Sequence, residues 1–245
     1  MTSHRIDALS PGVFSLDGRD IEFGPGDTIM QAVTRAGGYI PHLCWMEGFH
    51  PHGSCRLCTV KVNGRMGAAC TVLASTGQIV ESDTEELRTL RRTLLQMLFV
   101  EGNHFCPSCE KSGNCRLQAT AYEAGMTGPH FEEFYPQRKV DASHPDLLLD
   151  LNRCILCELC VRASHDLDGK DVFAVSGHGI DAHLVVNSPS GLLGDSALLA
   201  TDHAAKVCPV GALLPKRQGF AVPIGKRKFD LKPISASSPF DEAPQ

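Results

Sequence analysis

The sequence predicts an α+β protein made of three small modules that follow one another along the chain. Two observations lead to this fold class. Residues 13 to 81 alternate short strand patterns with one helix pattern, and the eleven cysteines fall into three successive groups. With 42% hydrophobic residues among 245, the chain can form several small cores.

The first module covers residues 11–83 and is expected to be a β-grasp unit. Asp27 or Thr28 can cap a helix that runs to about Ala36, just before a Gly-Gly pair. An Asn-Gly pair at 63–64 marks a hairpin turn. The predicted strands lie at residues 13–23 (two strands around an Asp-Gly turn), 59–62, 66–71 and 78–81.

The second module, residues 84–150, begins with an amphipathic helix from Thr84 to about Val100. Leucines repeat along one face of this helix, which favours packing on the neighbouring modules: Leu87, Leu90, Leu94, Leu95 and Leu98. A loop and a short helix are expected from His104 to about Gly125, and residues 126–150 are expected to be irregular. The third module covers residues 151–219. A basic tail follows at 220–245, and its last residues are expected to be disordered.

Composition excludes several functional classes. With 23 basic and 28 acidic residues the net charge is −5, so nucleic acid is a poor candidate partner. The N-terminus lacks the layout of a secretory signal, and no apolar run is long enough to span a bilayer. An odd number of cysteines with repeated C-x2-C spacing argues against disulfides and for a reducing compartment. We therefore expect a cytoplasmic protein without membrane contact.

The cysteine spacing indicates three inorganic centres. Eleven thiolates and one nearby histidine make twelve donors, which is three sites of four, and iron–sulfur clusters are the simplest interpretation. The predicted donors are Cys44, Cys55, Cys58 and Cys70; then His104, Cys106, Cys109 and Cys115; then Cys154, Cys157, Cys160 and Cys208.

The first group combines a long loop, a close pair and a distant fourth cysteine, from Cys44 through Cys55 and Cys58 to Cys70. This resembles the plant-type [2Fe–2S] pattern, although the first gap is longer. A small, flexible segment at 52–54 lets backbone amides approach the sulfurs. Zinc is the alternative metal, but zinc ribbons usually carry a second C-x2-C pair.

The middle group has only three cysteines, Cys106, Cys109 and Cys115, so a [4Fe–4S] cluster here needs another ligand. His104 is the preferred candidate, because no cysteine remains. A neutral imidazole in place of a thiolate should raise the reduction potential. The alternative is a three-cysteine cluster whose fourth iron carries water or a carboxylate, for which Glu110 is a candidate.

The third group has the bacterial [4Fe–4S] spacing: Cys154, Cys157 and Cys160, with Cys208-Pro209 far downstream. In two-cluster ferredoxins the Cys-Pro cysteine serves the other cluster. This chain has no second such quartet, so Cys208 is expected to complete the same cube. The module is therefore expected to resemble a bacterial ferredoxin.

Other charged side chains lie near these groups without being needed as ligands. His42, His50 and His52 are expected to be second-layer or exposed, and Arg56 and Arg116 either offset cluster charge or face solvent. The basic residues of the C-terminal segment either dock a partner or form a solvated face: Lys216, Arg217, Lys226, Arg227 and Lys228.

In order and ligand type, the three groups resemble the N-terminal part of the large iron–sulfur subunit of respiratory complex I and of [FeFe] hydrogenases. A narrower resemblance is to the small diaphorase subunit of bacterial NAD-reducing [NiFe] hydrogenases, with His-x-Cys spacing and a single cubane in the third module. The similar segments are Glu101 to His104, Cys106 to Cys115, Cys208 to Gly211, Lys216-Arg217 and Pro223 to Lys228.

The resemblance implies a heterotetramer with one [2Fe–2S] and two [4Fe–4S] clusters on this chain. One partner would hold FMN and the NAD site, and the small and large hydrogenase subunits would hold the [NiFe] module. This chain would relay single electrons between them, with no substrate chemistry of its own. The alternatives are the equivalent subunit of an NAD-linked formate dehydrogenase or a complex I-like NADH dehydrogenase, and a zinc-stabilised scaffold.

Overall fold

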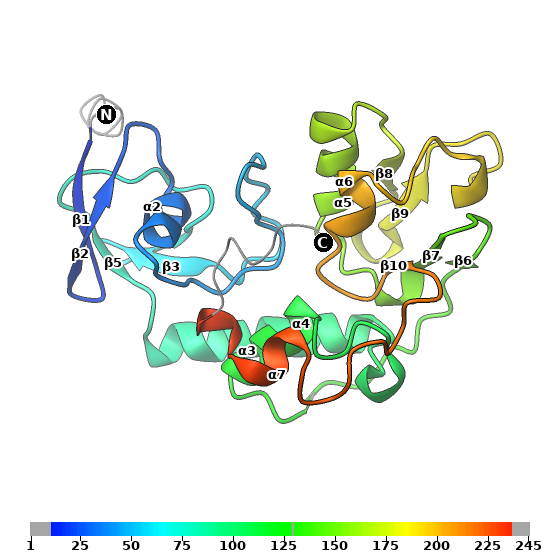
Figure 1. Ribbon diagram of the computed structural model, residues 1–245. Helices are drawn as coiled ribbons and strands as arrows, with labels where there is room; N and C mark the ends of the chain where they lie inside the picture. The colour runs from blue at the N-terminus through cyan, green and yellow to red at the C-terminus, as the bar shows by residue number, and fades with distance from the viewer. Residues whose placement is uncertain (1–10, 129, 237–245) are drawn as a thin grey trace.

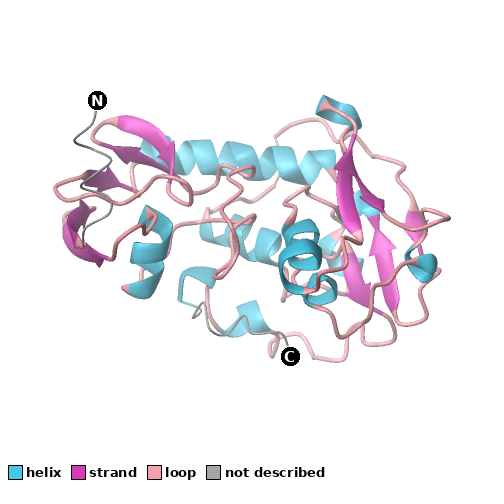
Figure 2. Cartoon of the chain, turned by 90° about the horizontal axis from the view of Figure 1, so that it is seen from above, coloured by secondary structure: helices cyan, strands magenta, loops and turns pink. Residues whose placement is uncertain are grey.

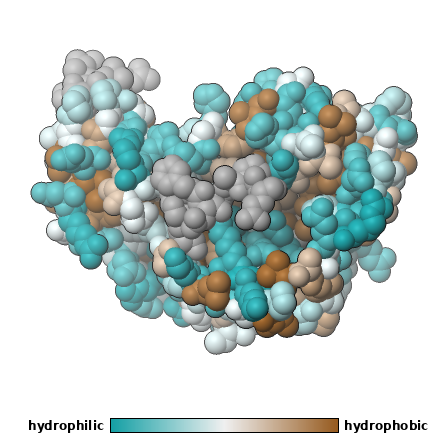
Figure 3. Space-filling model, in the orientation of Figure 1, coloured by the Kyte–Doolittle hydropathy of each residue, from teal (hydrophilic) through white to brown (hydrophobic). Residues whose placement is uncertain are grey.

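The computed structural model describes residues 11–128 and 130–236. Two lobes are joined along one side by helices, and a loop from the N-terminal lobe rises between them (Figure 1). Seen from above, the longest helix runs from one lobe to the other (Figure 2). The face shown in Figure 3 is notched between the lobes, and its hydrophobic residues form separate patches rather than one continuous surface.

The N-terminal lobe is a five-stranded sheet with a helix packed on it. The helix α2 (Ile29–Arg35) starts at Thr28, whose hydroxyl accepts from the Gln31 amide while the Gln31 side chain bonds back to Thr28. Ile29 and Val33 of this helix are fully buried. The sheet order is β2-β1-β5-β3-β4, with strands β1 (Gly12–Leu16), β2 (Arg19–Phe23), β3 (Thr59–Val62), β4 (Arg65–Ala68) and β5 (Ile79–Glu81).

Two helices connect the lobes. The longer, α3 (Glu85–Glu101), is capped by Thr84 and buries Leu87 and Leu95 completely. Behind it come the short turn η1 (Cys106–Ser108) and helix α4 (Arg116–Glu123). The described part of the tail packs back on this region through α7 (Lys228–Leu231) and η6 (Ile234–Ala236). The Phe229 amide, for example, donates to the Gly113 carbonyl.

The second lobe contains a three-stranded sheet, a separate hairpin and short helices. The sheet order is β10-β7-β6, with β6 (Val140–Asp141), β7 (Leu147–Asp150) and β10 (Leu213–Pro215). The hairpin pairs β8 (Phe173–Ser176) with β9 (His183–Val186). The helical elements are η2 (Leu151–Arg153), α5 (Leu159–Arg162), the π turn η3 (Ala163–Leu167), η4 (Gly179–Asp181), η5 (Leu193–Asp195) and α6 (His203–Lys206).

The structure confirms the predicted α+β content, the Thr28 cap, the helix after Thr84 and the hairpin around residues 63–64. The prediction that residues 126–150 are irregular is wrong for β6 and β7. The strand β7 pairs with β10, for example Leu149 with Leu213, and this partner lies far downstream. A strand defined by so distant a partner leaves little local signal in the sequence.

Two predictions concern residues outside the described ranges. They are the disorder at the end of the tail (237–245) and the lack of a secretory-signal layout at the N-terminus (1–10). Within the described part of the chain, no helix is both long and apolar enough to cross a membrane.

Arg91 ties the connecting helix α3 to the N-terminal lobe. It is 6% exposed, and its guanidinium donates to the carbonyl oxygens of Leu57 (3.0 Å), Thr59 (2.9 Å) and Ser82 (2.6 Å). Leu57 and Thr59 lie at the start of β3, and Ser82 follows β5. The Arg91 side chain therefore joins α3 to the ends of two strands. Burial lowers the pKa of Arg91, but the three carbonyl bonds satisfy its charged group.

We predict that Arg91→Met lowers the free energy of unfolding by about 3 kcal/mol, because three buried carbonyls lose their donor. Anaerobic urea unfolding followed by circular dichroism measures the change. Arg88→Met is the matched control on the same helix, since Arg88 is half-exposed and pairs with Asp83. The prediction fails if the two variants unfold at the same urea concentration.

Candidate iron–sulfur sites

The four cysteines of the first site form two close pairs. The Sγ atoms of Cys58 and Cys70 are 3.4 Å apart, and the thiols of Cys44 and Cys55 hydrogen-bond to each other. Through these bonds the pKa of Cys44 and of Cys70 is lowered and that of Cys55 and of Cys58 is raised, as if each pair shared one proton. Two pairs of thiolates suit a core with two irons, each needing two protein sulfurs.

The cysteine loops contain backbone conformations that are uncommon for residues other than glycine. Arg56, within the first C-x2-C segment, has φ +56°, while Leu156 and Glu158, on either side of Cys157, have φ +51° and +57°. Non-glycine residues in this region cluster at functional sites. Here they curl the chain so that nearby amides reach the sulfurs: the Leu57 amide donates to Cys55 and the Leu156 amide to Cys154.

The donors of the middle site line one cavity. His104 and the three cysteines Cys106, Cys109 and Cys115 surround it, so the structure brings all four predicted residues together. The Nε2 atom of His104 is buried and has no hydrogen-bond partner among the described residues. A buried ring nitrogen without a partner, on a residue that lines a cavity with three thiols, is what a ligand without its metal would look like.

The environment of His104 keeps its imidazole neutral. Burial, assisted by the positive charges of Arg153 and Arg138, lowers the pKa of His104 to about 4. The ring therefore has a free lone pair at neutral pH, as metal ligation requires. Glu110, the alternative ligand, instead directs its Oε2 atom to Arg153 at 2.9 Å.

Glycines leave room for two of the middle-site donors. A Cβ atom at Gly211 would lie 2.7 Å from the Sγ atom of Cys109, and one at Gly102 would overlap the His104 ring. Gly211 comes from the far end of the third module, three residues after Cys208. The middle site is therefore closed by a segment from another part of the chain.

The donors of the third site also share a cavity. Cys154, Cys157, Cys160 and Cys208 line it together with apolar side chains such as Leu149 and Leu213. The strand pair β7–β10 brings the distant Cys208 to the other three, because β10 follows it closely in the chain. Cys208 lies in the same cavity as its three predicted partners, and among the described residues no donor from another group lines it.

Burial raises the pKa of most of the thiols in the two cavities, to about 12 for Cys115 and to about 11 for Cys154. The pKa values of Cys106, Cys157 and Cys160 are raised for the same reason. Without a bound cation these side chains stay protonated thiols. Binding a metal core must therefore displace protons, and the positive charge of the core compensates for burying thiolates.

Within the described ranges, no three His, Cys, Asp or Glu side chains lie close enough together to hold a single metal ion. A polynuclear core places its ligands on different metal atoms, so its donors spread further apart than those around one zinc ion.

One apolar cluster touches donors of all three sites. It is built on fully buried leucines, among them Leu43, Leu57 and Leu95, which come from the first-site loop and from α3. The cluster includes one cysteine of the first site, one of the middle site and two of the third: Cys55, Cys115, Cys154 and Cys208. Closely packed apolar side chains therefore lie between the sites.

Arginines that the sequence does not single out connect the sites. Arg153 Nη1 donates to Glu110 and lies 3.7 Å from the Sγ atom of Cys109, although Arg153 directly precedes a third-site cysteine. Arg162, two residues after Cys160, bonds to carbonyls of the first and third sites. Closeness to cysteines in sequence is the only signal these residues give, and it does not reveal their distant partners.

The histidines near the first site differ in their surroundings. His42 is buried, its ring contacts Arg116, and burial lowers its pKa to about 3. Arg116 is itself buried. The Nε2 atom of His52 lies 3.2 Å from a carboxylate oxygen of Glu158, next to Cys157 of the third site, while His50 is exposed.

Much of the basic C-terminal group is bonded within the chain. Lys216 donates to the carbonyls of Ala142 and His144, Arg217 pairs with Asp146, and Arg227 pairs with Asp230. The Lys216 and Arg217 contacts hold the segment after β10 against the loop between β6 and β7, and the Arg227 contact lies within the tail. They give three of the basic residues a structural role.

Three family models match the chain in succession. Residues 13–85 match a 2Fe-2S iron-sulfur cluster binding domain, residues 91–130 an NADH-ubiquinone oxidoreductase-G iron-sulfur binding region, and residues 147–214 a 4Fe-4S single cluster domain. The expectation of both 2Fe–2S and 4Fe–4S binding regions on one chain is thereby confirmed.

The chain is 39% identical to the gamma subunit of the NAD-reducing hydrogenase HoxS of Cupriavidus necator over 223 residues, covering 91% of this chain and 94% of that relative. The chain belongs to this family of hydrogenase subunits. A crystal structure of NAD+-reducing [NiFe]-hydrogenase in the H2-reduced state contains a chain that is 57% identical, with a TM-score of 0.92. That match covers 94% of the present chain and 98% of the crystallised one.

A subunit of the NADH-quinone oxidoreductase of Rickettsia felis is 31% identical, but the match covers 89% of this chain and only 32% of that relative. The chain thus spans about a third of this longer protein. The predicted resemblance to NAD-reducing [NiFe] hydrogenases and to complex I is confirmed, and of the two relatives the hydrogenase subunit is matched over nearly its whole length.

We predict that His104→Ala removes or shifts the EPR signal of the middle cluster and leaves the other two, because the fourth ligand is lost. His104→Cys should retain the cluster at a lower reduction potential, since a thiolate adds negative charge. His178→Ala, which changes an exposed histidine of the second lobe, serves as control. If the EPR signal of the middle cluster is unchanged in His104→Ala, His104 is not a ligand of that cluster.

We also predict that Gly211→Ala lowers the occupancy of the middle cluster, because the new methyl group displaces the Cys109 sulfur. Iron content and the middle EPR signal are the measurements. Gly128→Ala is the matched control, since a Cβ there meets no atom within 4 Å. Equal iron content in the two variants contradicts the prediction.

Proposed function

We propose that this chain is the electron-transfer subunit of a cytoplasmic NAD-reducing [NiFe] hydrogenase. It relays single electrons between the hydrogenase module, formed by a small and a large subunit, and a diaphorase partner that binds FMN and NAD. The observation that carries the proposal is the presence of three complete donor sets on a chain that matches a hydrogenase gamma subunit over 94% of that relative's length.

We propose one [2Fe–2S] and two [4Fe–4S] clusters, held by the twelve predicted donors. The first would be bound by Cys44, Cys55, Cys58 and Cys70, the second by His104, Cys106, Cys109 and Cys115, and the third by Cys154, Cys157, Cys160 and Cys208. The two sulfur pairs and the two donor-lined cavities support this assignment. The unpaired Nε2 atom of His104 favours histidine over Glu110 as the fourth ligand.

The proposed division of the chain follows the same sites. The first unit is a β-grasp domain over residues 11–83, supported by the helix-covered sheet with order β2-β1-β5-β3-β4. The histidine-ligated unit begins at residue 84, and the ferredoxin-like unit extends to 219. The pairing of β7 with β10 supports including 147–150 in the latter, which shifts the boundary from 151.

We further propose that the third site lies between the other two in the relay. Arg162 bonds to carbonyls of Cys44 and Cys157 and so joins the first site to the third. The amide of Arg116, next to Cys115, donates to the Pro209 carbonyl, next to Cys208, and so joins the middle site to the third. Between the first and middle sites, His42 contacts Arg116.

Bound clusters supply one-electron carriers, and the protein supplies distance, insulation and electrostatics. The shared apolar cluster around Leu57 and Leu95 keeps water from the space between the sites. The Leu57 and Leu156 amides donate to ligand sulfurs and stabilise their negative charge. Arg153 places positive charge next to the middle site.

A second candidate function is that of the corresponding region of an NADH-quinone oxidoreductase, favoured by the 31% identity to the Rickettsia felis relative. The two functions differ in their partners rather than in the chemistry of this chain. A zinc-stabilised scaffold is the third, and the iron–sulfur family models argue against it.

We predict that the anaerobically purified native complex contains nickel and reduces NAD+ with H2. The isolated chain should carry 2 + 4 + 4, or about 10, iron atoms and as many acid-labile sulfides, the sum for the proposed clusters. Metal and sulfide analysis, EPR and an H2-dependent assay make the measurements. Quinone reduction by a complex without nickel would favour the NADH-quinone oxidoreductase function. Colourless protein that contains zinc would favour the zinc-stabilised scaffold.

A further inference from the structure

One arginine bonds to ligand residues of two different candidate sites. Arg162 is the last residue of α5, and its Nη2 atom donates to the carbonyl oxygen of Cys44 at 2.6 Å and to that of Cys157 at 3.1 Å. A single nitrogen atom therefore links the backbone of a first-site donor to the backbone of a third-site donor.

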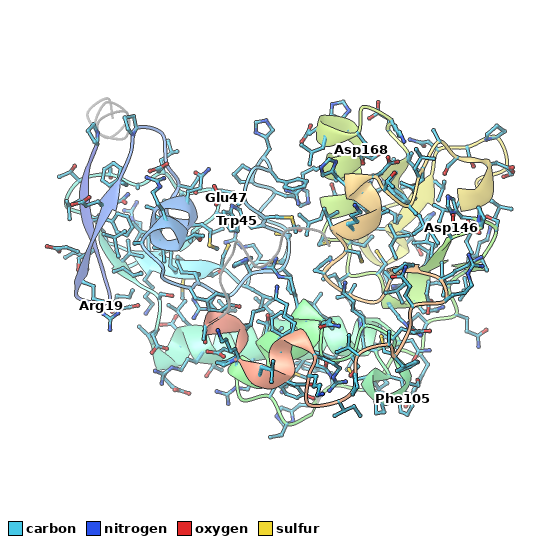
Figure 4. The ribbon with its side chains drawn as sticks, in the orientation of Figure 1. Arg19, Trp45, Glu47, Phe105, Asp146 and Asp168 are labelled. Carbon is cyan, nitrogen blue, oxygen red and sulfur yellow. The ribbon has the colours of Figure 1, made fainter. Side chains whose placement is uncertain are left out.

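The same side chain also holds the long loop of the first site. Its Nη1 atom donates to the His50 carbonyl at 2.6 Å, and its Cζ atom lies 5.9 Å from the centroid of the Phe49 ring. The segment that includes Trp45 and Glu47 passes between the two lobes at this point (Figure 4). We call residues 44–52 together with 157–162 the junction.

The charge of Arg162 is not neutralised by a carboxylate of the described residues. Its hydrogen bonds go to backbone carbonyls, including that of Glu158 at 3.3 Å from Nε, and the Glu158 carboxylate pairs with His52 instead. In the described part of the chain, no acidic group forms an ion pair with Arg162. A partly buried cation is therefore held beside two sites whose cysteines would be thiolates once a metal core is bound.

The partners of Arg162 differ from those of Arg91, which has a structural role only. Arg91 also donates to three carbonyls, but its acceptors lie within the N-terminal lobe and its border with α3. The acceptors of Arg162 belong to two lobes and to two donor sets. Arg162 also leads directly into the π turn η3, a type of irregularity that often occurs at functional sites.

We propose that Arg162 is a positioning residue that fixes the separation of the first and third sites and raises the reduction potential of both. This inference rests on the proposed function. In the step concerned, one electron leaves the reduced core of one site and enters the oxidised core of the other. No bond is made or broken, and no proton moves.

The test compares Arg162→Gln and Arg162→Lys with the matched control Arg217→Gln in the full complex. Arg217 lies in the same lobe and bonds to a backbone carbonyl and to Asp146, away from the junction. EPR-monitored redox titration measures the three potentials, with the middle site as internal reference. Hydrogen exchange measures opening of residues 44–52, and iron content measures integrity.

We expect Arg162→Gln to shift the first and third potentials to more negative values and to leave the middle one unchanged. Exchange in residues 44–52 should become about tenfold faster, because charge-assisted bonds to two carbonyls are lost. Arg162→Lys should keep the potentials near those of the native protein, since the charge stays. It should nevertheless show faster exchange, because a single ammonium nitrogen cannot replace the separate Nη1 and Nη2 atoms that bond to the His50 and Cys44 carbonyls.

The proposal is overturned if Arg162→Gln matches Arg217→Gln in both measurements. If Arg162→Gln does not retain its iron, Arg162→Lys provides the test. A hydrogen-exchange rate in residues 44–52 equal to that of the native protein overturns the proposal, and a faster rate supports it. Absence of iron from the native protein would instead refute the proposed function. The exchange data would then still report whether Arg162 fixes the junction.

Discussion

The convergence of buried sulfur donors from distant parts of the chain is the constraint on which the rest of this structure depends. Cys208 reaches its partners only because β10 pairs with β7, and Cys109 is closed in by Gly211 from the same distant segment. Burial raises the pKa of thiols such as Cys115 and Cys154, so that they are stable as neutral groups until a cationic core displaces their protons. Cluster binding at the middle and third sites would therefore release protons and add to the stability of the fold.

The connections between the sites are of two physical kinds. Apolar side chains fill the central space, and the cluster around Leu43 and Leu117 touches cysteines of all three donor sets. Guanidinium groups bridge the edges of this space, bonding to backbone carbonyls and to ligand neighbours. A dry centre with fixed cations at its border is suited to moving electrons, because neither water nor mobile ions must reorganise between the sites.

The sequence predicted the first module and the long helix well, since their signals are local. The Thr28 cap, the Asn-Gly hairpin and the leucine repeat of α3 act over a few residues, and the structure has each of them. The prediction was wrong where β6 and β7 occur, because the central strand β7 (Leu147–Asp150) pairs on one side with residues more than sixty positions downstream and on the other with the two-residue strand β6. The same separation hid the role of Gly211, which lies in sequence nowhere near the middle site.

The sequence by itself determined the number and chemistry of the candidate donors: eleven thiols and one favoured imidazole, in three sets whose spacing is typical of iron–sulfur proteins. This is possible because short spacings such as C-x2-C restrict which sulfurs can converge, and because the total leaves few ways to form sets of four. Only the tertiary structure decided how the sets face one another. The Arg162, Arg153 and Arg116 contacts depend on docking of whole modules, which results from summed burial across lobes rather than from any local pattern.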